Sequence, residues 1–271
     1  MSKYIKVNDI DDERVAIYTK YNEAQLLHYN EPYGGVFIAE SPMVIERAFD
    51  YGAKPISMFA ESGELHNEAI KNVIAKVGDD IDIYEADLDV IRSITGYNLT
   101  RGLLAAFERP KVKKPEELIV GCTHIAVLEN VVNPTNLGAI FRSAAALGID
   151  AVLITEDSTD PFYRRAARVS VGTVFQVPWT YIPKGTDYVD MLHNQGFTVM
   201  SMALTDDAIP LTDSRLKANE KRAIVFGSEG YGISESTLSK SDYVSIIPMH
   251  KGVDSLNVAA SSAVAFWELV K

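Results

Sequence analysis

The sequence predicts an α/β protein of two domains, and three observations lead to that prediction. Apolar runs alternate with helical segments throughout residues 119–271, and a shorter alternation occupies residues 1–109. Between them, residues 110–118 form a charged stretch with two prolines, which is typical of a domain boundary. A length of 271 residues with 47% hydrophobic side chains is enough for a core in each part.

Residues 1–109 are expected to form a small α/β unit. Helix 64–78 is the clearest element, because Ile70, Val73, Ile74 and Val77 fall at helical spacing and Gly78 stops it. Strands are expected at 34–41, 54–60 and 80–86, and further helices at 22–28, 42–53 and 88–96.

Residues 119–271 are expected to form a mostly parallel sheet covered by helices on both faces. The alternation of strand and helix predicts this arrangement. The expected strands are 124–131, 151–156, 173–179, 197–204, 223–229 and 243–249, and the expected helices are 137–147, 161–170, 187–195 and 257–270.

Composition indicates a soluble, cytoplasmic protein. The one cysteine, Cys122, excludes a disulfide framework and fits a reducing compartment. The N-terminus lacks a signal-peptide pattern, and no apolar run approaches the roughly 20 residues that span a bilayer.

The charge argues mildly against a general polyanion binder, since the net value is −11. Residues 1–110 carry 11 Lys and Arg against 19 Asp and Glu, and residues 119–271 carry 12 against 16. Contact with nucleic acid would therefore depend on local basic patches.

Two strand ends predict a ligand crevice built mainly of backbone. The apolar runs Ala223–Phe226 and Val244–Ile247 each lead into a turn rich in glycine and small polar residues. Ligands of open α/β sheets bind beyond the carboxyl ends of the strands. The first turn, GSEGYG at 227–232, does not have the dinucleotide-binding spacing. It places Glu229 among glycines, either in a cleft or on a plain tight turn.

The second turn leads into the C-terminal helix. Ser255 and Asn257 bracket the helix start, where they could bind a ligand or simply act as N-caps. The helix is apolar almost all round, which predicts burial within the fold or against another subunit.

The segment NPTNLGAIFRSAAALG, at 133–148, is a helix that Thr135 or Asn136 can cap. Arg142 follows Leu137 by five residues, which places it about 140° away from the apolar stripe. The helix start could receive an anionic or ribose group. The alternative is an ordinary amphipathic helix with one solvated arginine.

Arginines and aromatic residues are interleaved at 160–178. Arg164, Arg165 and Arg168 stand beside Phe162 and Tyr163, a combination that suits a phosphate backbone and a stacked base. A solvated charged face is the alternative.

Other chemistries have little support. The histidines, at positions 28, 66, 124, 193 and 250, have no metal-ligand spacing, so no metal is expected.

Three of these segments together resemble a known family. N-P-T-N-L-G-A-I-F-R-S-A, F-G-S-E-G-Y-G and I-P-M-x-K-G-V-D-S-L-N-V-A-A-S-S-A are similar, in order and spacing, to the three motifs of the SpoU (TrmH-type) RNA ribose methyltransferases of the SPOUT superfamily. The similarity covers residues 119–271. The N-terminal unit resembles more loosely the small RNA-binding domain related to ribosomal protein L30e.

The resemblance implies a parallel sheet whose C-terminal segment forms a deep trefoil knot, and a homodimer with a composite active site. It also implies S-adenosylmethionine bound within the knot. By motif position it implies catalytic roles for Asn136, Arg142, Glu229, Ser255 and Asn257. The implied cofactor-binding residues are Gly227, Ser228, Glu229, Ile247, Met249, Ser255, Leu256 and Asn257.

The resulting expectation is an RNA ribose-2′-O-methyltransferase that uses S-adenosylmethionine. The separate N-terminal unit favours ribosomal RNA over transfer RNA as the substrate. The candidate RNA contacts are Arg164, Arg165, Arg168, Lys111, Lys113 and Lys114. A catalytically silent RNA-binding or assembly protein is the alternative, and a nicotinamide-dependent enzyme is disfavoured by the missing early glycine fingerprint.

Overall fold

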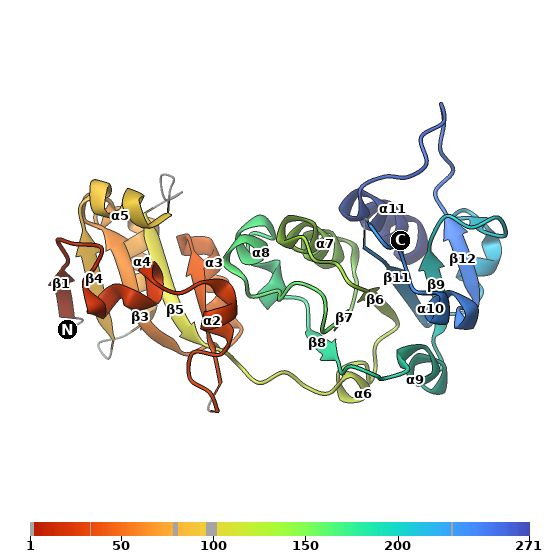
Figure 1. Cartoon of the computed structure of the whole chain (residues 1–271), viewed down its shortest axis with the longest axis horizontal. Coiled ribbons are helices and arrows are strands. Elements are labelled where there is room, and N and C mark those ends of the chain that lie inside the picture. Colours follow the sequence, from red (N-terminus) through yellow and green to blue (C-terminus); the bar gives the residue numbers. More distant parts are fainter. Residues whose placement is uncertain (1–2, 33, 78–80, 96–101, 229) are drawn as a thin grey trace. The chain divides into compact units, whose positions relative to one another are not determined.

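The computed structural model describes residues 3–32, 34–77, 81–95, 102–228 and 230–271 (Figure 1). The chain separates into two compact units. The first comprises Met1–Lys111 together with Phe162–Phe175, and the second comprises Val112–Pro161 and Gln176–Lys271. The predicted boundary at 110–118 gave no sign that Phe162–Phe175 would join the first unit.

The first unit is built on a mixed five-stranded sheet in the order β1-β4-β3-β5-β2. β3 and β4 are parallel, whereas β5 runs antiparallel to both β2 and β3. The strands are β1 (Lys3–Lys6), β2 (Val36–Glu40), β3 (Pro55–Glu61), β4 (Asp82–Ala86) and β5 (Leu103–Glu108). β1 and β5 were not predicted from the sequence.

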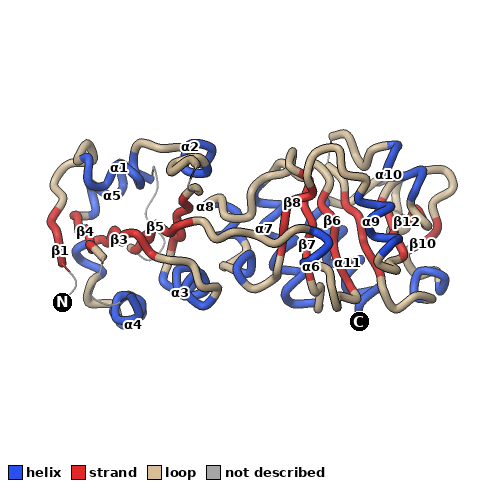
Figure 2. The backbone as a smooth tube through the Cα atoms, turned by 90° about the horizontal axis from the view of Figure 1, so that it is seen from below, coloured by secondary structure: helices blue, strands red, loops and turns tan. Residues whose placement is uncertain are grey.

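Helices lie on both faces of this sheet, with α3 and α4 on one side and α1, α2 and α5 on the other (Figure 2). The helical segments of the unit are η1 (Glu13–Val15), α1 (Ala16–Thr19), α2 (Glu23–Leu27), α3 (Pro42–Asp50), η2 (Ser62–Glu64), α4 (Glu68–Val77), α5 (Leu88–Thr95), α8 (Arg164–Val169) and η3 (Thr173–Phe175). The core on the α1 side gathers Tyr18, Leu26, Ile38, Phe59 and Leu104, all buried.

Phe162–Phe175 is held in the first unit by an aromatic cluster. The Phe162 ring stacks on Phe37 at a centroid distance of 4.8 Å and on Phe175 at 5.2 Å. The Arg109 guanidinium lies 5.1 Å from the Phe162 ring centroid. Residues 173–179 were predicted as a strand, and that prediction is wrong. Thr173–Phe175 forms the 3-10 helix η3 within this cluster, and the strand begins only at Trp179.

The second unit has a seven-stranded sheet in the order β10-β12-β9-β11-β6-β7-β8, with every pairing parallel. The strands are β6 (His124–Leu128), β7 (Ala151–Thr155), β8 (Trp179–Ile182), β9 (Thr198–Met202), β10 (Ile209–Pro210), β11 (Arg222–Phe226) and β12 (Tyr243–Ile246). The central strands are buried on both faces, as parallel sheets require. The prediction of an α/β fold with a parallel sheet is confirmed.

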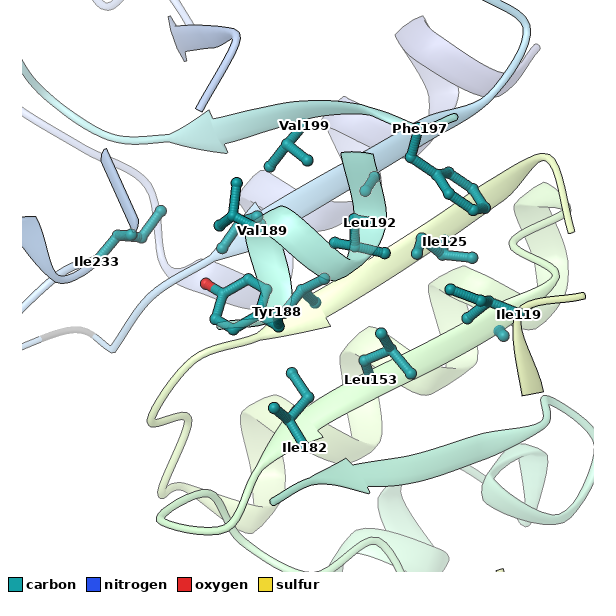
Figure 3. Close-up of a cluster of buried hydrophobic side chains, with 14 residues drawn as sticks. Ile119, Ile125, Leu153, Ile182, Tyr188, Val189, Leu192, Phe197, Val199 and Ile233 are labelled. Carbon is teal, nitrogen blue, oxygen red and sulfur yellow. The ribbon is translucent and has the colours of Figure 1, made fainter. Parts of the chain in front are cut away.

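The helical segments of this unit are α6 (Pro115–Leu118), α7 (Pro134–Leu147), α9 (Tyr188–Asn194), η4 (Ser214–Lys217), α10 (Glu235–Lys240) and α11 (Val258–Val270). α9 packs on one face of the sheet, where Val189 and Leu192 meet Ile125, Leu153 and other strand residues (Figure 3). α7 and α11 pack against each other, and Phe266 of α11 meets Phe226 of β11 edge to face.

The C-terminal helix is not buried all round in the single chain, so of the two predicted forms of burial, burial within the fold covers only part of it. Phe266 and Leu269 are fully buried, but Val264 is 40% and Trp267 63% exposed. None of the helices that the structure describes is long and apolar enough to span a bilayer.

Candidate active site

A cavity of about 670 Å³ lies at the carboxyl ends of β9, β11 and β12. Its walls come from the strand ends, from the loops that follow them, and from the first turn of α11. Its volume falls in the range of roughly 300–1,000 Å³ that is typical of small-molecule sites. Both strand ends that the sequence singled out, those of β11 and β12, contribute to it.

The loop after β11 is a tight hairpin on one wall of the cavity. Ser228 and Gly232 exchange two backbone hydrogen bonds, of 3.1 and 3.0 Å. A Cβ at Gly227 would lie 2.3 Å from the carbonyl carbon and oxygen of Gly232, so no other residue fits there. The absence of a side chain leaves backbone groups facing the cavity.

The loop after β12 forms another wall and leads into α11. Asn257 is the N-cap of this helix, and its side-chain oxygen accepts a hydrogen bond of 3.0 Å from the Ala259 N–H. Lys251 and Gly252 adopt positive φ values of 60° and 71°, which turn the chain back before Asp254 reaches the cavity.

Seven of the eight predicted cofactor-binding residues line this one cavity. They are Gly227, Ser228, Ile247, Met249, Ser255, Leu256 and Asn257. The eighth, Glu229, lies outside the described residues. The structure thus brings together residues from two loops that the sequence separates by about twenty positions.

The sequence reasoning missed a third wall. Met202, Ala203, Leu204 and Thr205 line the cavity from the end of β9. The signal was present, because residues 197–204 were recognised as a strand. A strand next to β11 in a parallel sheet delivers its carboxyl end to the same edge.

Asn136 connects this cavity to α7. Its side-chain oxygen accepts a hydrogen bond of 3.2 Å from the Asn257 side-chain nitrogen. Asn133 rather than Thr135 or Asn136 is the N-cap of α7, accepting a hydrogen bond from the Thr135 N–H. Because Asn136 is not the N-cap, its side chain can contact Asn257 of the third motif. Asn136 is buried in this position.

Arg142 lies on the same helix, about two and a half turns beyond Asn133, and its side chain is exposed. The structure shows no hydrogen bond or ion pair from its guanidinium to another described residue. The position agrees with the predicted displacement from the apolar stripe, whose members Leu137, Ile140 and Phe141 are buried. Because the guanidinium makes no hydrogen bond or ion pair within the described chain, it can contact a ligand.

The candidate RNA contacts occupy different environments. Lys111, Lys113 and Lys114 are exposed, as is Arg165. Arg168 instead lies 3.4 Å from the carboxylate of Glu40, a strand residue whose side chain is fully buried.

Arg164 is partly buried at the start of α8. Its backbone N–H donates a hydrogen bond of 3.0 Å to the Glu23 carboxylate. Arg164 and Arg168 are thus integrated into the first unit, and Arg165 is the arginine of this helix that is open to a ligand.

The fold and the site together define a class of α/β protein with a parallel sheet and a cavity at the ends of its strands. Comparison with known proteins then identifies the family. The model of the SpoU rRNA Methylase family matches residues 123–267, and the chain belongs to this family.

Relatives in sequence and structure agree. The chain is 36% identical to an uncharacterized tRNA/rRNA methyltransferase of Mycobacterium bovis, over 85% of this chain and 79% of that protein. It is 31% identical to the 23S rRNA (guanosine(2553)-2′-O)-methyltransferase RlmP of Bacillus subtilis, over 57% of this chain and 61% of that protein. The AdoMet-bound rRNA methyltransferase of Sinorhizobium meliloti has the same fold, with a TM-score of 0.81, 22% identity, and coverage of 98% of this chain and 97% of the other.

Proposed function

We propose that this protein transfers the methyl group of S-adenosylmethionine to a ribose 2′-hydroxyl of RNA. One observation carries the proposal: the hydrogen bond from Asn257 to Asn136 joins the strand-end cavity to the helix that bears the exposed Arg142. The cavity and the helix that bears Arg142 are thereby in direct contact. The family membership and the AdoMet-bound relative of Sinorhizobium meliloti support the same chemistry.

The cavity suits the cofactor. Its walls include Gly227 and Ser228 of one loop, and Ile247, Met249 and Leu256 of the other. Backbone N–H and C=O groups can recognise an adenine edge and an amino acid, while the apolar side chains cover the purine. Bound S-adenosylmethionine would supply an electrophilic methyl carbon on a positively charged sulfur.

Arg142 is proposed to act on the ribose. A guanidinium stays protonated at ordinary pH, so it is poorly suited to act as a base. It can hold the phosphate next to the target nucleotide and polarise the 2′-hydroxyl. Arg142 would thus hold the hydroxyl oxygen toward the methyl carbon that bound S-adenosylmethionine would supply, and the hydroxyl proton would leave to solvent or to the phosphate.

The remaining catalytic residues are proposed to fix the alignment of oxygen, carbon and sulfur, on which the rate of such a displacement depends. Asn136 and Asn257 would orient the ribose or the methionine portion through their mutual contact. Ser255 and Glu229 would act from the two loops.

Ribosomal RNA is the proposed substrate, and the cytoplasm the proposed location. The name of RlmP, which methylates ribose in 23S rRNA, supports this choice. The first unit is a separate α/β body, as in an L30e-like RNA-binding domain, and we assign it to substrate binding. Arg165 and the exposed lysines 111, 113 and 114 would contact phosphates.

A homodimer with a knotted second unit completes the proposal. After β12 the chain returns to place α11 against α7 and β11, and this packing is compatible with the proposed knot. Val264 and Trp267 are exposed three positions apart on α11, so they share one face. A second copy would cover this apolar face, and Trp267→Glu should convert a dimer to monomers in sedimentation analysis.

The decisive experiment is methyl transfer from labelled S-adenosylmethionine to total RNA from a strain that lacks the gene. We expect transfer to RNA from that strain and little transfer to RNA from the parent. A ribose-methylation map of both RNAs would locate the nucleotide. Binding of RNA without binding of S-adenosylmethionine would instead identify a silent family member and overturn the proposal.

A further inference from the structure

The hairpin between β11 and α10 is held at its base by a residue that does not line the cofactor cavity. Glu129 follows β6, and its backbone N–H donates a hydrogen bond of 2.8 Å to the carbonyl of Phe226, immediately before Gly227. Its carboxylate oxygen Oε1 accepts a hydrogen bond of 2.7 Å from the Ser234 N–H, immediately after Ile233. One residue therefore fixes both ends of the loop 227–233.

The second carboxylate oxygen of Glu129 is anchored from the helices. Oε2 accepts hydrogen bonds of 2.5 Å from the Tyr188 hydroxyl and 2.8 Å from the Thr237 hydroxyl. These two hydroxyl oxygens are themselves 3.0 Å apart. The side chain is thus locked between α9, α10 and the loop, with no freedom to adopt another rotamer without losing several of these bonds.

The charge of Glu129 strengthens this arrangement. Burial alone would raise the pKa of the carboxyl, but the hydrogen bonds from Tyr188, Ser234 and Thr237 outweigh burial and lower it. The group is an ionised acceptor at neutral pH, and hydrogen bonds to ionised groups are about twice as strong as neutral ones.

Glu129 is not among the residues that line the cofactor cavity. It borders a separate cavity of about 570 Å³ beside Tyr188 and Thr237. Any effect of Glu129 on the cofactor must therefore pass through the loop.

We infer that Glu129 is a positioning residue for cofactor binding, which holds the two described ends of the loop after β11, Gly227 and Ile233, in the conformation that forms the cavity wall. The inference rests on the proposed function, since that wall is assigned to S-adenosylmethionine. It goes beyond the three sequence motifs, because Glu129 precedes the first of them, and its carboxylate holds the second through Ser234, which follows that motif.

The Ser234 N–H offers a selective test. Ser234 has a φ of −63°, which proline adopts without strain. Ser234→Pro removes the N–H that Glu129 binds, and Ser234→Ala is the matched control that loses the hydroxyl but keeps the N–H. Tyr188→Phe is a second control, because it removes a bond to the Glu129 carboxylate that does not involve the loop.

The measurements are the dissociation constant for S-adenosylmethionine by calorimetry, KM and kcat for methyl transfer, and the melting temperature. We expect Glu129→Ala and Ser234→Pro each to weaken binding about tenfold, the size of a typical coupling between contacting residues. KM should rise more than kcat falls. The double variant should bind no more weakly than either single one, and Ser234→Ala and Tyr188→Phe should bind within about twofold of the unchanged protein.

The outcomes separate this inference from the proposed function. If the unchanged protein does not bind S-adenosylmethionine, the proposed function fails, whatever the variants do. If it binds and both Glu129→Ala and Ser234→Pro bind equally well, Glu129 has no positioning role. The inference is also overturned if Ser234→Ala weakens binding as much as Ser234→Pro, since the loss of the Ser234 hydroxyl would then explain both. Should Glu129→Ala fail to fold, Ser234→Pro against Ser234→Ala still decides.

Discussion

The side-chain nitrogen of Asn257 donates a hydrogen bond of 3.2 Å to the side-chain oxygen of Asn136, across 121 positions of sequence. Asn257 also caps α11 and lines the cavity. The pair therefore connects the N-terminus of α11 to the first turn of α7. Capping and coupling use different atoms of Asn257, so substitutions can separate them.

Asn257→Ser should reduce methyl transfer while leaving the fold intact. Serine is as good an N-cap as asparagine, but it lacks the amide that reaches Asn136. We expect a loss of about tenfold in kcat/KM, corresponding to roughly 1.4 kcal/mol, for removal of this coupling. Asn257→Ala should lose the same activity and an additional ~1 kcal/mol of stability, because the cap is lost too. Equal stability of the two variants in urea denaturation would contradict this division of roles.

Arg142 should matter for chemistry and not for stability. Its guanidinium is exposed and has no partner in the part of the chain that the structure describes, so Arg142→Ala should change the free energy of unfolding by less than about 0.5 kcal/mol. Turnover should fall by about 100-fold or more, the usual loss when a charge-stabilising donor is removed. Calorimetry should show undiminished binding of S-adenosylmethionine.

Arg142→Lys is the informative companion to that variant. Lysine keeps the positive charge but not the planar fork that can contact a phosphate and a hydroxyl together. We expect most of the activity to be lost here as well. Full activity in the lysine variant would show that charge alone is sufficient.

The arginines of α8 should separate into a structural and a ligand-binding group. Arg168→Ala removes a partner of the buried Glu40 carboxylate, and a hydrogen bond to a charged group contributes about 1.5–3 kcal/mol. We therefore expect a clear fall in melting temperature. Arg165→Ala should leave the melting temperature unchanged, weaken RNA binding, and lower the slope of log affinity against log salt by about one.

Glu129→Gln should reveal a pH-dependent contribution to stability. In the folded chain hydrogen bonds hold the pKa of this carboxyl below its ordinary value of 4.5, even though burial opposes them. At acidic pH the unfolded chain thus takes up the proton first, and stability rises with pH through this range. The stabilisation is complete well above pH 4.5 and is lost as the pH falls through the folded-state pKa.

Urea denaturation of both proteins from pH 3 to pH 8 would check this expectation. The unchanged protein should exceed Glu129→Gln by about 1–3 kcal/mol at neutral pH. The difference should be constant above roughly pH 6 and should shrink in the acid range. If the difference in stability persisted unchanged below the folded-state pKa, the glutamine amide would be destabilising the protein by disturbing its packing. Loss of the charged acceptor would then not be the cause.

Local sequence was sufficient for the central strands and for most of the cavity. β6, β7 and β11 are short, continuous apolar runs, which are typical of buried parallel strands. The cavity followed from the glycine-rich turns after β11 and β12. The end of β9 was missed because nothing local marks a strand end as a ligand wall. Its place beside β11 is a property of the sheet order.

Other features depend on partners that are distant in sequence. Thr173–Phe175 has the composition of a strand, yet its aromatic residue packs on Phe162 and Phe37, and the segment turns into a 3-10 helix. Arg168 looks like a solvated arginine until Glu40, 128 positions away, is placed beside it. Tertiary contacts override local propensity in both cases.

The inclusion of Phe162–Phe175 in the first unit has an evolutionary consequence. A recombination event that replaced only residues 1–111 with the corresponding part of a relative would leave Phe162 and Phe175 against a foreign sheet. Each buried phenylalanine contributes roughly 1.5–3 kcal/mol to the free energy of unfolding, so such a chimera would be only marginally stable. The two stretches are expected to be inherited together, and functional hybrids between relatives should be found only where both were exchanged.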